Sequence, residues 1–171
     1  MSGYAEVIQV VGAMIIFGLI LLSSNSMILR NSMFQVEGEL EQEVIALGQE
    51  IIEEAQTKSF DQVTYNTEAP PADIPGGFTP PGQLGPDPGE PNRSDFNDFD
   101  DYHGWADQVT TEHGTFNLSA EVFYVDPVTL EQVEQQSTFK KIEVTVWSDQ
   151  LTRGGEPIEY KLEFIRNYYA D

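Results

Sequence analysis

The sequence lacks cysteine and has few basic residues. With no cysteine it can form neither a disulfide framework nor a thiolate metal site. Only 8 Lys and Arg stand against 29 Asp and Glu, and the formal net charge is −21. Nucleic-acid binding relies on Lys and Arg that neutralise phosphates. We therefore expect no direct nucleic-acid partner, and divalent cations or a basic partner fit this charge better.

Residues that commonly carry catalysis are also scarce. The sequence has 2 histidines, His103 and His113, and no serine in a Gly-x-Ser-x-Gly setting. Carboxylate pairs are so frequent that a glycosidase-like spacing arises by chance. His103 followed by Gly104 is more typical of a turn. We expect that the protein is not an enzyme, and a membrane-tethered degradative enzyme stays only as a formal alternative.

The most apolar stretch runs without a charge from Val7 to Leu29, between Glu6 and Arg30. A helix rises about 1.5 Å per residue, so this run can cross the ~30 Å hydrocarbon core of a bilayer. No basic region precedes it and no Ala-x-Ala-like site follows it, so a removable secretory signal is the poorer interpretation. We expect residues 1–32 to be the apolar half of a helix that stays on the protein, in a membrane or at the core of a filament.

An amphipathic half follows at residues 33–58. Apolar residues recur there at intervals of three and four, the spacing of one buried helix face, and glutamates fill many of the positions between them. The apolar set is Met33, Val36, Leu40, Val44, Leu47 and Ile51, widened by Ile45, Ile52 and Ala55. Because no proline interrupts it, we predict one helix from about Tyr4 to about Thr57.

Residues 59–107 form a Pro/Gly-rich and acidic loop region. All but two of the 10 prolines lie between Tyr65 and Arg93. Such a segment cannot continue a helix or sit inside a sheet. Long loops are often either functional or disordered. Two interpretations stay open, a flexible linker and an ordered loop packed on the globular part.

Residues 108–171 show the alternation of three half-buried strands. The apolar faces are Phe116, Leu118, Ala120, Val122 and Tyr124; Ile142, Val144 and Val146; and Ile158, Tyr160, Leu162 and Phe164. Turn signals at Asp126-Pro127 and Gly154-Gly155 connect the strands, which predicts an antiparallel meander. In this interpretation Val128 to Val133 adds a short piece to the first hairpin.

A small sheet with one apolar face needs a cover, and the amphipathic half of the helix is the available partner. The predicted fold class is therefore α+β, a long N-terminal helix packed on a small antiparallel sheet. The apolar first half of the helix is left without a partner inside the chain. It has to be buried in lipid or against copies of itself.

This organisation resembles the type IV pilin and pseudopilin superfamily. Two stretches sharpen the resemblance, Asp98 to Trp105 and Phe139 to Val146, which look like segments of MSHA-type minor pilins and related prepilin-like proteins. In this family a glutamate is the fifth residue of the mature chain. Glu6 is fifth when counted from Ser2, and third if a leader ends at Gly3.

The resemblance implies a structural subunit of an extracellular or envelope filament, held in the cytoplasmic membrane before assembly. Its partners would be copies of itself in a helical homopolymer, together with the pilus assembly machinery and the inner membrane. The residues expected to carry assembly are Glu6, Val7, Val11, Ile15, Phe17, Leu19 and Leu22. A carboxylate at the edge of an apolar bundle favours a stagger in which it meets a positive group, so Glu6 would select the register.

An acidic cluster in the loop region supplies hard oxygen ligands of the kind that Ca²⁺ prefers. The candidate ligands are Asp95, Asn97, Asp98, Asp100 and Asp101. Their spacing does not match an EF-hand, and a solvated acidic loop is the alternative. Calcium is the one cofactor that the sequence indicates. The alternative function is a single-span, membrane-anchored binding module that is exposed outside the cytoplasmic membrane, with calcium as its candidate cofactor.

Overall fold

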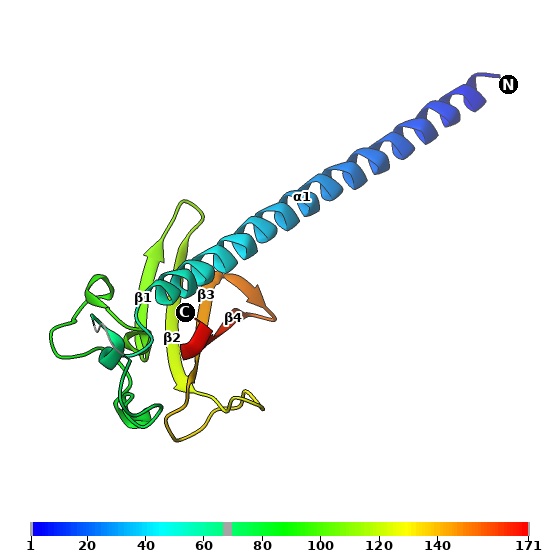
Figure 1. The fold of residues 1–171 in the computed structure, drawn as a ribbon. Coiled ribbons are helices and arrows are strands. Elements are labelled where there is room, and N and C mark those ends of the chain that lie inside the picture. The colour runs from blue at the N-terminus through cyan, green and yellow to red at the C-terminus, as the bar shows by residue number, and fades with distance from the viewer. Residues whose placement is uncertain (1, 67–69, 171) are drawn as a thin grey trace. The chain divides into compact units, whose positions relative to one another are not determined.

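The computed structural model describes residues 2–66 and 70–170, and the chain divides into two compact parts (Figure 1). We call them the N-terminal part, Met1–Leu40, and the head, Glu41–Asp171. Each is described by itself below. The boundary between them falls inside the single long helix α1, Ser2–Thr57, so the predicted continuous helix is confirmed.

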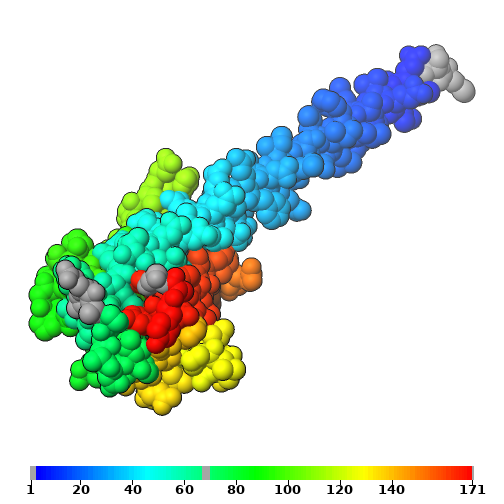
Figure 2. All heavy atoms as spheres, in the orientation of Figure 1, coloured from blue at the N-terminus to red at the C-terminus, as the bar shows by residue number. Residues whose placement is uncertain are grey.

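The N-terminal part is helical and its large apolar side chains are exposed. The exposed fractions of Val7, Ile15 and Leu22 are 62%, 59% and 71%. Figure 2 draws this segment in blue. Met33 and Val36 are exposed as well, at 72% and 54%. The predicted buried face therefore begins later than its apolar pattern does, because these two residues have no partner within their own part.

The head contains a four-stranded antiparallel sheet in the order β1-β2-β3-β4. Its strands are β1 Trp105–Thr110, β2 Thr115–Tyr124, β3 Phe139–Arg153 and β4 Glu156–Asn167. Gly154 and Gly155 have φ of +67° and +94°, values that suit glycine and close the β3–β4 turn. The predicted α+β class and the antiparallel meander are confirmed.

The fourth strand comes from a different place than the sequence indicates. β1 begins at Trp105, inside the predicted loop region, and pairs with β2 along its whole length. The piece predicted at Val128 to Val133 is only a β-bridge between Val125 and Gln132. The side chain of Asp126 accepts hydrogen bonds from the backbone N–H groups of Val128 and Thr129, which holds this segment in a turn.

The helical segment of the head, residues 41–57, packs on the apolar face of the sheet. Val44, Ile51 and Ala55 are buried from the helix side. A Cβ added to Gly48 would lie 2.9 Å from Cδ1 of Leu162, so the helix backbone approaches the sheet most closely there. The sheet contributes Phe116, Leu118, Ala120, Val122, Ile142, Val144 and Val146 to this core. The predicted packing of helix on sheet is confirmed.

The described part of the loop region is ordered and packed on the head. Phe78, Phe96, Phe99 and Tyr102 are all buried. Short 3-10 turns lie at Gln62–Thr64, Pro81–Gln83, Arg93–Asp95 and Asp100–Tyr102, and another follows β4 at Tyr168–Ala170. Of the two interpretations of this segment, the packed loop agrees with the structure over residues 59–66 and 70–104.

Arg93 fastens this loop to the helix. Its guanidinium donates to the carboxylates of Glu50 and Glu54 and lies 5.5 Å from the ring centre of Trp105. The hydroxyl of Tyr102 donates to Glu54 at 2.8 Å. Loop, helix and β1 therefore share one set of polar contacts at the edge of the head.

Candidate functional site

The residues predicted to carry assembly all lie in the N-terminal part and are exposed. They are Glu6, Val7, Val11, Ile15, Phe17, Leu19 and Leu22. At 3.6 residues per turn, Val7, Val11 and Leu22 share one side of α1 while Phe17 points to another. The run is therefore apolar on all sides.

Among the described residues, one α-helix is long and apolar enough to cross a membrane, the helix from Gly3 to Thr57. Its most apolar window has a mean hydropathy of 2.4 and is 0% buried. This helix indicates membrane insertion.

The residues predicted to bind calcium do not form one metal-binding group in the described part of the chain. Asp95 lies in an exposed 3-10 turn and accepts from the side chain of Asn92, and the amide of Asn97 contacts Glu90. Asp98, Asp100 and Asp101 are buried. Over residues 2–66 and 70–170, no three His or acidic side chains are arranged to hold a metal ion. Calcium binding stays a prediction.

Two of the buried aspartates, Asp61 and Asp100, pair with one lysine, and Asp98 and Asp101 interact with Asp100. We call this cluster the Lys140 site: Asp61, Asp98, Asp100, Asp101 and Lys140. The side chain of Lys140 is 0% exposed. Its Nζ donates to the backbone oxygen of Phe60 at 2.8 Å, to Oδ2 of Asp61 at 2.8 Å, and to Oδ1 of Asp100. A buried charge is costly unless it is paired and hydrogen-bonded, and here all three donor positions of the ammonium are used.

Three distant segments position these side chains. Lys140 stands in β3 on the same face as Ile142 and Val144, because residues two apart in a strand point to the same side. Asp61 follows the end of α1, and Asp100 opens the 3-10 turn Asp100–Tyr102. Two aromatic rings complete the enclosure, since Nζ lies 4.7 Å from the ring centre of Phe60 and 5.3 Å from that of Tyr124.

Asp61 is the most extensively bonded carboxylate of the site. Its Oδ2 accepts from the backbone N–H of Thr79 at 2.9 Å and from the hydroxyl of Tyr124 at 3.3 Å. Its Oδ1 accepts from the N–H of Val63 and from the hydroxyl of Thr79, both at 3.3 Å. Both carboxylate oxygens of Asp61 therefore accept hydrogen bonds, in addition to the ion pair of Oδ2 with Lys140.

Two of the other three aspartates, Asp98 and Asp101, hold protons more tightly than usual. Burial raises the pKa of Asp98 to about 9, and the charge of Asp100 and a side-chain hydrogen bond with Asp100 add to the effect. Burial also raises the pKa of Asp101 to about 6, against the opposing effect of the N–H groups of Asp98 and Asn97. Asp98 is therefore a neutral acid at pH 7. The protonated carboxyl lies directly beside the Lys140–Asp100 ion pair.

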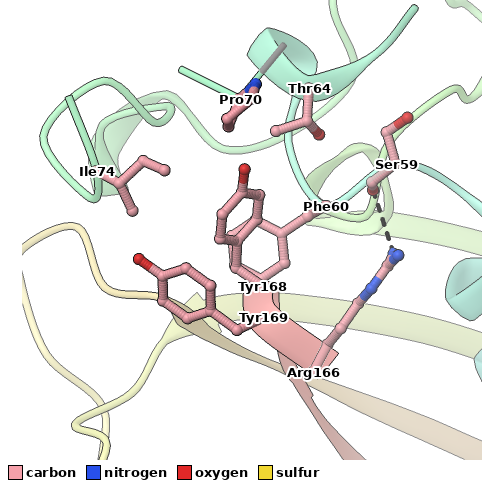
Figure 3. Close-up of a pocket in the computed structure, with 8 residues that line it drawn as sticks. All are labelled: Ser59, Phe60, Thr64, Pro70, Ile74, Arg166, Tyr168 and Tyr169. Carbon is pink, nitrogen blue, oxygen red and sulfur yellow. Dashed lines mark hydrogen bonds between the residues drawn. The ribbon is translucent and has the colours of Figure 1, made fainter. Parts of the chain in front are cut away.

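A second feature of the head is an open hollow of about 610 Å³ that Phe60 helps to line (Figure 3). It is lined by Ser59, Phe60, Thr64, Pro70, Ile74, Arg166, Tyr168 and Tyr169. Figure 3 shows the aromatic rings gathered at its centre and Arg166 at its edge. Nη1 of Arg166 donates to the backbone oxygens of Lys58 and Ser59 at 2.7 and 3.2 Å, which caps the carboxyl end of α1. This lining fits an apolar or aromatic group better than a charged one.

The histidines have structural contacts. Nδ1 of His103 accepts from the N–H of Val122 at 3.2 Å, and Gly104 has φ of +74°, in agreement with the predicted turn. Nδ1 of His113 lies 2.6 Å from a carboxylate oxygen of Glu43. Both ring systems thus brace loops of the head.

Comparisons with protein-family models, with curated proteins and with solved structures find no match for this chain.

The Lys140 site was missed by the prediction from sequence, although a signal for it exists. Lys140 has the same strand parity as Ile142, Val144 and Val146, so a lysine occupies an inward position. Such a lysine requires buried anions, and the nearby acidic loop offers several. The sequence does not say which of the aspartates meet it, since their pairing depends on the folded path of residues 59–104.

Proposed function

We propose that this protein is a structural subunit of a type IV pilus-like filament, extracellular or in the cell envelope, that polymerises through its N-terminal helix. The observation that carries the proposal is the uncharged run from Val7 to Leu29, whose large side chains are exposed. Monomeric soluble proteins rarely expose a contiguous apolar patch beyond a few hundred Å². This helix needs lipid before assembly and copies of itself afterwards.

The continuity of α1 favours a filament subunit over a simple anchor. A membrane anchor needs an apolar span but has no need for that span to belong to the same helix as the packing segment of the head. In a polymer, by contrast, one continuous helix would join each core segment to its head without a linker. The alternative, a membrane-anchored binding module, would use the span only for attachment.

Within this proposal Glu6 sets the stagger between neighbouring subunits. It is exposed and stands at the edge of the uncharged run. An isolated carboxylate is costly to bury among apolar helices, so packings that give it a cationic partner are favoured over those that do not. Its contribution is to register and not to the stability of the head.

The test is electron microscopy of material sheared from the cell surface, with mass spectrometry of the same fraction to identify the chain and its N-terminus. Thin ordered filaments that contain this protein and stay soluble without detergent would support the proposal. We expect Glu6→Ala to lower the filament yield while the head unfolds at the same temperature. Glu37→Ala, at another exposed position of α1, is the matched control. A chain that stays in the membrane as a detergent-soluble monomer would overturn the filament and favour the anchored binding module.

A further inference from the structure

We propose that Lys140 and Asp100 become joined by an amide bond between Nζ and Cγ, formed by the chain itself within the Lys140 site. This inference goes beyond the proposed function, because it concerns the head alone and does not depend on assembly. The bond would link β3 to the loop region across 40 residues of sequence. It would give a chain without cysteine a covalent brace.

The amine and the carboxyl group are already held in contact. Nζ of Lys140 contacts Oδ1 of Asp100, and their side chains are 0% and 3% exposed. β3 fixes the lysine between its ladder partners Tyr124 and Arg166, while the 3-10 turn fixes Asp100. Two groups held in this way react as one molecule, at effective concentrations far above any in solution.

The hydrogen bonds favour Asp100 over Asp61 as the acyl group. Asp61 accepts hydrogen bonds from Thr79, Val63 and Tyr124, and its Oδ2 lies 2.8 Å from Nζ, within reach of the proton that the ammonium has to lose. The side chain of Asp100 instead shares a hydrogen bond with that of Asp98. The neighbour that holds a proton at neutral pH is therefore directed at the carboxyl group that has to lose an oxygen.

The reaction balances without a co-reactant. The ammonium of Lys140 gives a proton to Asp61, and the free amine attacks Cγ of Asp100 while Asp98 donates a proton to the carboxyl oxygen. The C–N bond forms, the nitrogen returns one proton to Asp98, and one C–O bond breaks as the oxygen leaves as water with the proton from Asp98 and the proton that Asp61 had taken up. Asp61 and Asp98 relay protons and end in their starting states. A neutral amide replaces an ion pair whose desolvation opposes burial, which favours the product.

Tryptic digestion of the full chain in detergent tests the bond directly. No Lys or Arg lies between Arg93 and Lys140, so an unmodified chain releases the peptide 94–140 at full mass. We expect instead a peptide 94–141, uncleaved after Lys140 and lighter by one water. A second cut by a glutamate-specific protease after Glu121 separates Asp100 from Lys140 in sequence, and the two halves should stay joined.

Other digestion products contradict the proposal. A peptide 94–140 at full mass would overturn the bond itself. A link between this region and the peptide 59–93 would overturn Asp100 as the acceptor in favour of Asp61. Both readouts use the unsubstituted protein, so they do not depend on whether any variant folds.

Two variants check the assigned roles. Lys140→Arg keeps a positive charge but removes the primary amine, so the loss of water should disappear; a dehydrated aspartate elsewhere in the peptide would persist and overturn the assignment. Asp98→Asn removes the proton donor and should lower the linked fraction at early times at least tenfold. Linking as fast as in the unsubstituted chain would overturn the part given to Asp98.

Discussion

The two parts of the molecule distribute polarity in opposite ways. The N-terminal part exposes an uncharged run, in which Phe17 and Leu22 are 62% and 71% exposed. The head places a lysine and several aspartates in its interior, where Lys140 and Asp61 are 0% exposed. The head supplies partners for its buried charges from its own residues, whereas the large apolar side chains of the N-terminal part are exposed.

Removal of the central cation should have the largest effect on the head. Lys140→Ala leaves Asp61 and Asp100 buried without their partner, and breaking a buried pair in this way costs about 3–5 kcal/mol. We expect the unfolding midpoint of the detergent-solubilised chain to fall sharply. The fluorescence of Trp105 and Trp147, which lie in the sheet, measures this midpoint.

The matched control for that substitution is Lys161→Ala. Lys161 is an exposed lysine of β4 that pairs with Glu143 at 2.6 Å. Exposed ion pairs contribute little to stability, so the midpoint should hardly move. If both lysine variants lowered the midpoint equally, the special role of the buried cation would be wrong.

A charge introduced into the apolar half of α1 should leave the fold of the head intact but prevent membrane insertion and filament formation. Ile15→Asp places a carboxylate within the uncharged run, and an aspartate at the centre of a membrane span costs about 2.5–3.5 kcal/mol. We expect the chain to leave the membrane fraction and form no filaments, while the near-ultraviolet circular dichroism of the head is unchanged. Ile15→Leu is the control. If the Ile15→Asp variant stayed in the membrane fraction, the role given to the exposed apolar run in membrane insertion would be wrong.

The close approach of helix and sheet provides a smaller test. Gly48→Val adds bulk at a position where an added Cβ would lie 2.9 Å from Leu162 and 3.4 Å from Val146. Overpacking of this kind costs about 1–3 kcal/mol. Gly38→Val meets nothing within 4 Å and should be nearly neutral. Denaturant unfolding of both variants measures the difference, and equal midpoints would show that the head tolerates a wider spacing.

The pH dependence of stability should depend on Asp98. Its folded pKa of about 9 lies above the ordinary 3.8, so the folded state holds a proton that the unfolded state has lost between these values. The contribution is complete below about pH 4 and is lost as the pH rises toward 9, by up to about 1.4 kcal/mol per pH unit. Asp101, with a pKa of about 6, acts in the same direction over a narrower range. Asp98→Asn should flatten the slope measured by unfolding from pH 5 to 9, and an unchanged slope would assign it to other groups.

The regular elements were largely predictable because their patterns are periodic. The apolar run and the stripe through Val44 and Ile51 predict one helix, and the alternation from Phe116 to Tyr124 predicts β2. β1 was not predictable in this way. It is an edge strand whose residues Ala106 to Gln108 are all exposed, so it carries no alternation, and only its hydrogen-bonded ladder with β2 defines it.

The Lys140 site shows a different limit. The acidic residues from Asp95 to Asp101 are conspicuous in the sequence, and their composition predicts a cation ligand. The structure places an internal lysine ammonium beside Asp100 and Asp61, which are 39 residues apart along the chain. The acidic composition predicts only that the partner of these residues carries a positive charge. Whether that partner is a metal ion or a lysine depends on tertiary packing.

The order in which α1 and the sheet appear along the chain affects how the protein is made. Chains emerge from the ribosome with the N-terminus first, so the apolar run is complete before any strand of the head exists. The helical segment of the head can pack only after its partners have been synthesised. The hydroxyl of Tyr160, which donates to Glu41, comes 119 residues later, and Lys140, which donates to Asp61, comes 79 residues later. A nascent chain can thus reach the membrane with its apolar helix already formed while the rest of the chain is still unfolded. Its charged interior closes only after β3 and the loop region have both arrived.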